Sequence, residues 1–368
     1  MLRSRTVLPL VCLGLLLGVI PLAALQPAQA RPQLPAPKGS DPITAGAPYS
    51  GDFPDPWIMR LGAKYYAYST TSGAQGFPVN VPMLTSTDLH TWIARPATPD
   101  APAGDALPRV ATWAARTTLS DTRTRPGQGP WAPSVAKIGK HDFVLAYAVQ
   151  VAAAPGTLMC ISLAHASNPT GPFVDTTTQP TLCPTRGAID PQVFIAPNGR
   201  PWLVWKRDLY PAKLWTQPMD LAATGVLPGK PAHYLAKVNQ AWEGSIIENP
   251  AMIRYQNRYY VFYSANSYAT TNYAIGYLIC KSYKGDCHKP RKKPLIKSRW
   301  SIAGPGGPAP FIDTRGRLRL GYHAWRTNEV GYNTVDCQLL QPTCGQRRLY
   351  VATLKVVKGG KLQVKKLY

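Results

Sequence analysis

Three carboxylates in the chain stand at the start of short apolar segments, each close to a proline. Asp55 and Asp190 are followed directly by proline, and Glu248 is followed by Asn249 and Pro250. Two carboxyl groups are enough for inverting hydrolysis of a glycosidic bond, because one protonates the leaving oxygen while the other activates water about 6.5–9.5 Å away. A third carboxylate nearby would keep the acid protonated through like-charge repulsion. Alone, an Asp-Pro pair only caps a turn, so this chemistry requires a fold that brings the three side chains together.

The sequence repeats one pattern five times: a proline, a short apolar strand, a turn with Gly or Asn, and a second strand rich in aromatic residues. The prolines are Pro56, Pro133, Pro191, Pro250 and Pro308, and most lie about sixty residues apart. Five strand-rich units of this size predict an all-β chain folded as a five-bladed β-propeller. The first strand of each propeller blade lines the central channel, so the residue before each proline is expected near the axis. Those residues are Asp55, Ala132, Asp190, Asn249 and Gly307.

The N-terminal residues 1–30 have the pattern of a secretory signal peptide. An apolar run extends from Val7 to Leu25, and the segment ends in a small-residue cleavage pattern at Ala30. An uncleaved membrane anchor is the alternative, which Pro9 and Pro21 disfavour. We therefore expect cleavage after Ala30 and a secreted protein, either extracellular or periplasmic.

The remaining chain is expected to form one catalytic domain after a short leader. Residues 31–46 are rich in proline and predict a loose leader. The five repeats occupy nearly all of residues 47–368, which leaves no room for a second domain of ordinary size.

The cysteines indicate disulfide bonds. Removing residues 1–30 takes away Cys12 and leaves six of the seven cysteines, an even number in an exported chain. Their spacing predicts the pairs Cys160–Cys183, Cys280–Cys287 and Cys337–Cys344. No two of these cysteines have the close spacing of a zinc site.

The chain is strongly basic, with 41 Lys and Arg against 18 Asp and Glu, for a net charge of +23. Such a charge favours contact with an anionic surface such as a cell-wall polymer, or serves only to keep the protein soluble. The basic residues are scattered and no nucleic-acid motif accompanies them, so we expect no nucleic-acid partner.

Four motifs, FPDPWI, GPWAPSV, AIDPQVF and IIENPAM, occur in this order. Together they resemble glycoside hydrolase family 43, and the resemblance spans roughly Asp52 to the C-terminus. It implies a five-bladed β-propeller that cleaves glycosidic bonds with inversion, requires no cofactor, and acts mostly on arabinofuranosides, arabinan and xylosides. It further implies that Asp55 is the general base, that Asp190 orients the acid and tunes its pKa, and that Glu248 is the general acid.

Four other residues are candidates for the site. Trp131 is expected as an aromatic platform for a sugar ring or as a core residue, and Glu243 as a substrate-binding residue and rival acid. His323 is expected to contact substrate or to hold a structural calcium ion in the central channel, although a lone His on a strand is often simply hydrogen-bonded. Arg326 is expected either to contact substrate or to be a surface charge.

The sequence as a whole predicts a monomeric, secreted, inverting α-L-arabinofuranosidase-type enzyme that acts on polysaccharides such as arabinan or arabinoxylan. A β-xylosidase or an endo-arabinanase would use the same three carboxylates. A fructan-cleaving propeller would instead retain configuration through an Asp nucleophile. A non-catalytic secreted carbohydrate-binding propeller is the alternative from another class, which the intact set Asp55, Asp190 and Glu248 disfavours.

Overall fold

The computed structural model describes residues 49, 51–71, 79–118, 124–126, 129–152, 157–332 and 345–367. The predicted signal peptide, the predicted leader and the predicted pair Cys337–Cys344 lie outside these residues and stay predictions. In the described part of the chain, no helix is long and apolar enough to cross a membrane.

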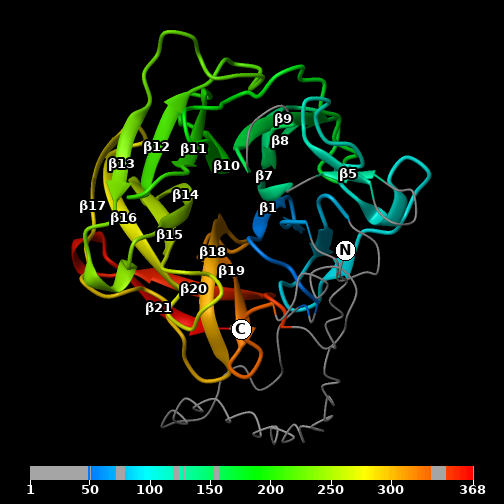
Figure 1. Cartoon of the computed structure of the whole chain (residues 1–368). Helices are drawn as coiled ribbons and strands as arrows, with labels where there is room; N and C mark the ends of the chain where they lie inside the picture. The colour runs from blue at the N-terminus through cyan, green and yellow to red at the C-terminus, as the bar shows by residue number, and fades with distance from the viewer. Residues whose placement is uncertain are drawn as a thin grey trace, which may run out of the picture. The chain divides into compact units, whose positions relative to one another are not determined.

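Five antiparallel sheets surround a common centre and form the blades of a β-propeller (Figure 1). Blade 1 contains β1 (Trp57–Leu61), β2 (Lys64–Tyr68), β3 (Met83–Ser86) and β4 (Ile93–Ala94). Blade 2 contains β7 (Trp131–Gly139), β8 (Asp142–Gln150) and β9 (Met159–Ala166). Blade 3 contains β10 (Ala188–Ile195), β11 (Pro201–Arg207), β12 (Lys213–Pro218) and β13 (His233–Lys237). Blade 4 contains β14 (Ile247–Tyr255), β15 (Arg258–Ala265), β16 (Ala274–Ser282) and β17 (Gly285–His288). Blade 5 contains β18 (Ile302–Ile312), β19 (Leu318–Arg326), β20 (Arg348–Val356) and β21 (Leu362–Leu367).

Short elements complete the described chain. A two-stranded ribbon of β5 (Arg116–Thr118) and β6 (Thr124–Pro126) lies in the connection between blades 1 and 2. Single 3₁₀ turns are formed by η1 (Pro102–Gly104), η2 (Ala241–Glu243) and η4 (Lys358–Gly360).

Blade 2 differs from the other four blades, because its sheet contains three strands among the described residues instead of four. Among the described residues, the outer side of β9 is paired only through isolated bridges, His165 with Val174 and Ile161 with Leu182. Pro169 and other prolines interrupt the segment that follows β9. Proline has no N–H to donate, so this segment cannot form a continuous ladder along β9.

The five repeats share one backbone irregularity at the residue that directly precedes each repeat proline. These residues adopt left-handed φ angles, at Asp55 (46°), Ala132 (42°), Asp190 (55°), Asn249 (48°) and Gly307 (60°). In blades 2 to 5 the strand pairing also shifts register across the same dipeptide, as a β-bulge does. A cavity of about 30 Å³ is lined by all five dipeptides, so the prediction that these residues lie at the axis is confirmed.

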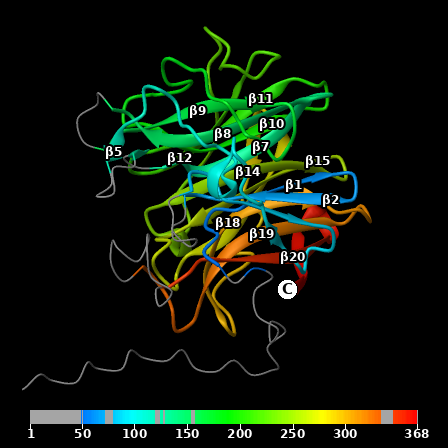
Figure 2. The ribbon, with the colours of Figure 1, turned by 90° about the vertical axis from the view of Figure 1, so that its right-hand side faces the viewer.

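Adjacent blades pack through shared hydrophobic clusters, and the last blade packs against the first. Ile58 and Leu84 of blade 1 form one buried cluster with Leu349 and Val351 of blade 5. In the same region Tyr49 pairs with Leu349, and β1 lies beside β18 in both views (Figures 1 and 2). The C-terminal strands β20 and β21 form an antiparallel pair, and β20 contributes to closing the ring.

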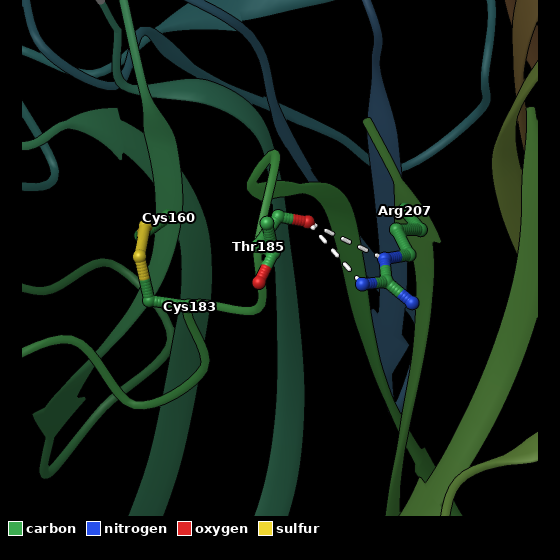
Figure 3. Close-up of a disulfide and its surroundings, with 4 residues drawn as sticks. All are labelled: Cys160, Cys183, Thr185 and Arg207. Carbon is green, nitrogen blue, oxygen red and sulfur yellow. Dashed lines mark hydrogen bonds between the residues drawn. A yellow bond between two sulfur atoms is a disulfide. The ribbon is translucent and has the colours of Figure 1, made fainter. Parts of the chain in front are cut away.

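Two of the three predicted disulfides are confirmed, Cys160–Cys183 and Cys280–Cys287. The first joins β9 to the loop that leads into β10 (Figure 3). In that loop the carbonyl oxygen of Thr185 accepts hydrogen bonds from Nε and Nη2 of Arg207, each at 3.4 Å. The bridge ties this loop to β9 of blade 2, and the Arg207 contact ties it to the end of β11.

Candidate active site

Asp55, Asp190 and Glu248 line one pocket with a volume of about 210 Å³. They come from different blades: Asp55 directly precedes β1, Asp190 lies in β10, and Glu248 lies in β14. The structure thus brings together the three carboxylates that the sequence singled out. Their placement follows from the left-handed residue before each repeat proline, because that residue or its neighbour is turned toward the axis.

Asp55 is held as an anion. Its Oδ2 accepts a hydrogen bond from Thr70 Oγ1 at 2.8 Å and lies 3.4 Å from Nη1 of Arg347. Burial alone would raise the pKa of Asp55, but the charge of Arg347 and hydrogen bonds from Thr70 and Asn249 together lower it below its ordinary value. A carboxylate that stays ionised is what a general base requires.

Glu248 lies in a hydrogen-bond chain that suits a protonated carboxyl group. The Tyr273 hydroxyl oxygen is 2.7 Å from Glu248 Oε1 and 2.8 Å from Asn249 Oδ1. A hydroxyl group has one proton, so it cannot donate to both oxygens. If Glu248 is protonated and donates to Tyr273, then Tyr273 can donate to Asn249 and both contacts are satisfied. Burial raises the pKa of Tyr273, so its phenol keeps its proton.

Asp190 is buried beside Glu248 and a lysine. Its Oδ2 accepts a hydrogen bond from the backbone N–H of Asn249 at 2.8 Å, which ties β10 to the bulge of β14. Burial raises the pKa of Asp190 to about 8; Lys206 opposes this rise and Glu248 adds to it.

Comparison with known proteins agrees with this geometry. The model of the family "Glycosyl hydrolases family 43" matches residues 47–343. The chain belongs to glycoside hydrolase family 43. It is similar to a β-D-galactofuranosidase of Aspergillus niger, with 22% identity over 333 residues, covering 88% of this chain and 87% of the relative.

Solved structures share the fold. An endo-1,4-β-xylanase from Bacteroides thetaiotaomicron has a TM-score of 0.65 and 24% identity, covering 87% of this chain and 97% of its own. An α-L-arabinanase from Cellvibrio cellulosa has a TM-score of 0.60 and 20% identity, covering 85% of this chain and 95% of its own. As a member of family 43, the chain is a glycosidase.

Trp131 lines the same pocket as the three carboxylates and is half-buried at the start of β7. Its expected role as a sugar platform is compatible with this placement and stays a prediction.

Glu243 does not reach the pocket, contrary to the expectation that it binds substrate. It is fully buried in η2, where its Oε2 accepts hydrogen bonds from the backbone N–H groups of Asn239 and Gln240. Its Oε1 accepts a hydrogen bond from Tyr263 at 2.6 Å and lies 2.7 Å from Nζ of Lys289. All of its acceptor capacity is used to cap a turn and pair a buried lysine, so its role is structural.

His323 lies beneath the pocket rather than in its wall. Its side chain is fully buried, and its Nδ1 accepts the backbone N–H of Asp55 at 2.9 Å. Burial and Arg347 lower the pKa of His323 to about 3, so the ring is neutral. Its hydrogen bond holds the backbone of Asp55, the proposed base, in place. Among the described residues, no group of three or more His, Cys, Asp or Glu side chains could hold a metal, so the expected calcium finds no support.

Arg326 is also outside the pocket. It is exposed at the end of β19, where it pairs with Ile302, so the surface-charge alternative is the one that fits.

The residues that sequence reasoning missed are mostly cations and hydroxyl groups that complete the pocket. Arg347, just before β20, also donates from Nε to the Tyr332 hydroxyl at 3.0 Å, and its guanidinium lies 4.9 Å from the Tyr268 ring centre. Lys206 in β11 places its Nζ 3.1 Å from Glu248 Oε2. Neither residue belongs to the repeated proline pattern, so no local signal marked it.

Proposed function

We propose that this chain is an exported, inverting furanosidase that releases terminal α-L-arabinofuranosyl residues from polysaccharides such as arabinan or arabinoxylan. The observation that carries the proposal is the asymmetry of the pocket carboxylates. Asp55 is held as an anion by Arg347 and Thr70, whereas Glu248 lies in a hydrogen-bond chain suited to a carboxylic acid. Opposite protonation states on facing carboxyl groups are the requirement of inverting hydrolysis.

In this mechanism Glu248 gives its proton to the glycosidic oxygen as the bond from that oxygen to the anomeric carbon breaks. Asp55 takes a proton from a water molecule, whose oxygen bonds to the anomeric carbon from the opposite face. The released sugar therefore has inverted configuration. Asp190 positions the acid side through its hydrogen bond from the Asn249 N–H. Arg347 and Thr70 hold the base in the ionised state.

The size of the pocket favours removal of one terminal sugar over cleavage within a chain. Its volume of about 210 Å³ is below the roughly 300–1,000 Å³ of pockets that hold drug-sized ligands. Tyr268, Tyr332 and Trp131 supply aromatic surface around it. A single sugar ring stacked on one of these side chains fits such a space better than several linked rings.

A β-D-galactofuranosyl substrate is the second candidate, favoured by the similarity to the Aspergillus niger β-D-galactofuranosidase. β-D-Galactofuranose and α-L-arabinofuranose share their ring configuration and differ by one hydroxymethyl group. A pocket built for one therefore needs only a small enlargement to accept the other. A β-xylosidase, with a six-membered substrate ring, and an endo-arabinanase are further alternatives for the same carboxylates.

The test is a matched panel of nitrophenyl α-L-arabinofuranoside, β-D-galactofuranoside and β-D-xyloside, with linear arabinan as polymer. We expect the arabinofuranoside to give the highest kcat/KM, and NMR to show inverted product. Preference for the galactofuranoside would select the second candidate. Retention of configuration would refute the mechanism, and arabinan binding without any hydrolysis would indicate a carbohydrate-binding propeller.

Variants assign the roles of the two carboxylates. Glu248→Gln is expected to lower hydrolysis of a natural arabinoside by about 10²–10⁴-fold, the usual range for an acid–base group, and of an activated aryl glycoside by less. Asp55→Asn should impair both substrates similarly, because water is no longer activated. Glu243→Gln tests the rival acid: full activity of Glu248→Gln with loss in Glu243→Gln would reverse the assignment.

The proposal that the protein is exported rests on the signal-peptide pattern of residues 1–30 alone. A mature protein recovered outside the cytoplasm with Arg31 as its first residue would support it, and a full-length chain retained with the cells would contradict it.

A further inference from the structure

Lys206 is a buried cation surrounded by carboxylates. Its side chain is 8% exposed, and its Nζ lies 3.1 Å from Glu248 Oε2 and 3.3 Å from Asp208 Oδ1. Asp190 also attracts it electrostatically. Burial would lower the pKa of Lys206, but attraction from Glu248, Asp190 and Asp208 raises it above its ordinary value, so the lysine is permanently charged.

A cation next to a general acid needs a functional reason. An opposite charge at this distance favours the ionised form of the carboxyl group, which is not the form that begins the reaction. However, an acid in a buried site becomes a carboxylate as it gives up its proton, and an isolated buried carboxylate is strongly unfavourable. A fixed cation that meets this developing charge lowers the barrier, because it is already in place when the proton moves.

We propose that Lys206 is a positioning residue for the acid step, whose ammonium group stabilises the carboxylate that Glu248 becomes when its proton passes to the leaving oxygen. This inference rests on the proposed role of Glu248 as the acid. In the step, the bond between anomeric carbon and leaving oxygen breaks, its electron pair stays on that oxygen, and the oxygen takes the proton of Glu248. The anomeric carbon forms its new bond to the oxygen of the water molecule that Asp55 deprotonates.

Lys206 meets three carboxyl groups in this part of the structure, those of Glu248, Asp190 and Asp208. Its single positive charge therefore offsets only part of the negative charge that these groups carry when they are ionised. The partly exposed Asp208 also contacts Lys206, from the end of β11. The Tyr273 hydroxyl faces Glu248 from the start of β16 and stays protonated. Asp55 adds a weaker repulsion to Asp190 across the pocket. Removing Lys206 would therefore increase the net negative charge around Glu248 as it donates its proton.

The experiment compares Lys206→Met with the wild-type chain in the pH dependence of kcat/KM, using an arabino-oligosaccharide and nitrophenyl α-L-arabinofuranoside. We expect the basic limb of the profile to move to higher pH by about 1–3 units, because the lost cation no longer favours the ionised pair. We also expect kcat/KM for the oligosaccharide at the optimum to fall about tenfold, and for the aryl substrate to fall less, because an activated leaving group needs less protonation.

Two matched controls separate this role from a structural one. Lys206→Arg keeps the charge and should keep the basic limb in place. Lys213→Met removes a half-buried lysine from the neighbouring strand β12 and should change neither the limb nor the leaving-group dependence. A purely structural role would lower activity on both substrates equally and leave the limb where it is in the wild-type chain, and that result would overturn the proposal.

Other outcomes are also decisive. If Lys206→Met does not fold, Lys206→Gln carries the same expectation, and failure of both variants to fold would assign Lys206 to stability instead. If Glu248→Gln is fully active, the proposed function is wrong in its choice of acid. If Glu248→Gln is inactive while Lys206→Met keeps the wild-type profile, only the inference about Lys206 fails.

Discussion

Substitution of Gly307 by alanine should displace His323 or Asp55 and so disturb the active site. Gly307 has a left-handed φ of 60°, and a Cβ at this position would lie 2.7 Å from His323 Nδ1 and 2.8 Å from the Cα of Asp55. The left-handed backbone costs a non-glycine residue about 1–2 kcal/mol. Forcing extra volume into a packed region costs about 1–3 kcal/mol more. We therefore expect Gly307→Ala to lower the free energy of unfolding by about 2–5 kcal/mol.

The effect on activity should exceed the effect expected from stability alone. His323 Nδ1 accepts the N–H of Asp55, so a displaced ring or a displaced Asp55 moves the base directly. A misplacement of about 1 Å in a catalytic group can cost about 10²-fold in rate. The assay is urea unfolding together with kcat on nitrophenyl α-L-arabinofuranoside, measured where the variant is fully folded.

Gly62→Ala is the matched control. Gly62 has φ 61° in the turn between β1 and β2, and no atom lies within 4 Å of the position its Cβ would take. It should cost only about 1–2 kcal/mol from the backbone conformation and leave kcat unchanged. If Gly307→Ala cost no more than Gly62→Ala and kept full activity, close packing of Gly307 against His323 and Asp55 would be wrong.

Two further predictions concern pH and disulfides. Asp190→Asn should lose activity. Its free energy of unfolding should exceed that of the wild-type chain by more at about pH 9 than at about pH 5. The reason is that burial raises the pKa of Asp190 to about 8, so the folded state holds a proton that the unfolded state has lost, and the stability of the wild-type chain falls as pH rises from about 4 to about 8. Equal gains in urea unfolding at both pH values would contradict this. Replacing Cys160 and Cys183 with alanine should lower the free energy of unfolding by about 3 kcal/mol, because the bridge spans 23 residues. The same change at Cys280 and Cys287, 7 residues apart and already strand partners, should cost less, and the reverse order in urea unfolding would count against the chain-entropy argument.

The blades and the pocket carboxylates could be predicted because both depend on one repeated local signal. A proline marks the start of each inner strand, and the residue before it takes a left-handed conformation and faces the axis whatever its type. The same rule separates Glu248 from Glu243, five positions earlier in the chain. Glu248 adjoins a bulge and reaches the pocket, whereas Glu243 ends a 3₁₀ turn and turns its carboxylate back to cap it.

The residues that set the charge of the pocket could not be predicted in this way. Arg347 meets Asp55 across 292 positions, and Lys206 meets Glu248 across 42 positions. Neither follows a proline or stands in a recognisable motif, and the chain offers many other lysines and arginines. Their place is decided by how complete blades pack against one another. The departure of blade 2, whose described sheet has three strands, has a local cause, because the prolines after β9 prevent a continuous ladder along its outer side.

The repeated bulge also explains how a nearly symmetric fold makes an asymmetric site. The bulge N–H of Ala132 donates to Thr70 Oγ1 of blade 1, and that of Asn249 donates to Asp190 of blade 3. Likewise the N–H of Gly307 donates to Ser264 Oγ of blade 4, and that of Asp55 donates to His323 of blade 5. In each case the acceptor is a side chain of the preceding blade around the ring.

These contacts fix the catalytic groups as well as the backbone. The hydroxyl group of Thr70 accepts a hydrogen bond from the N–H of Ala132 and donates one to Asp55 Oδ2. Asp190, held by the N–H of Asn249, is placed beside Glu248. The left-handed conformation of these residues costs free energy, and such strain persists only where surrounding contacts hold the backbone in place. Here the hydrogen bond to the preceding blade holds it. The contacts that stabilise the ring therefore also orient the base and the acid.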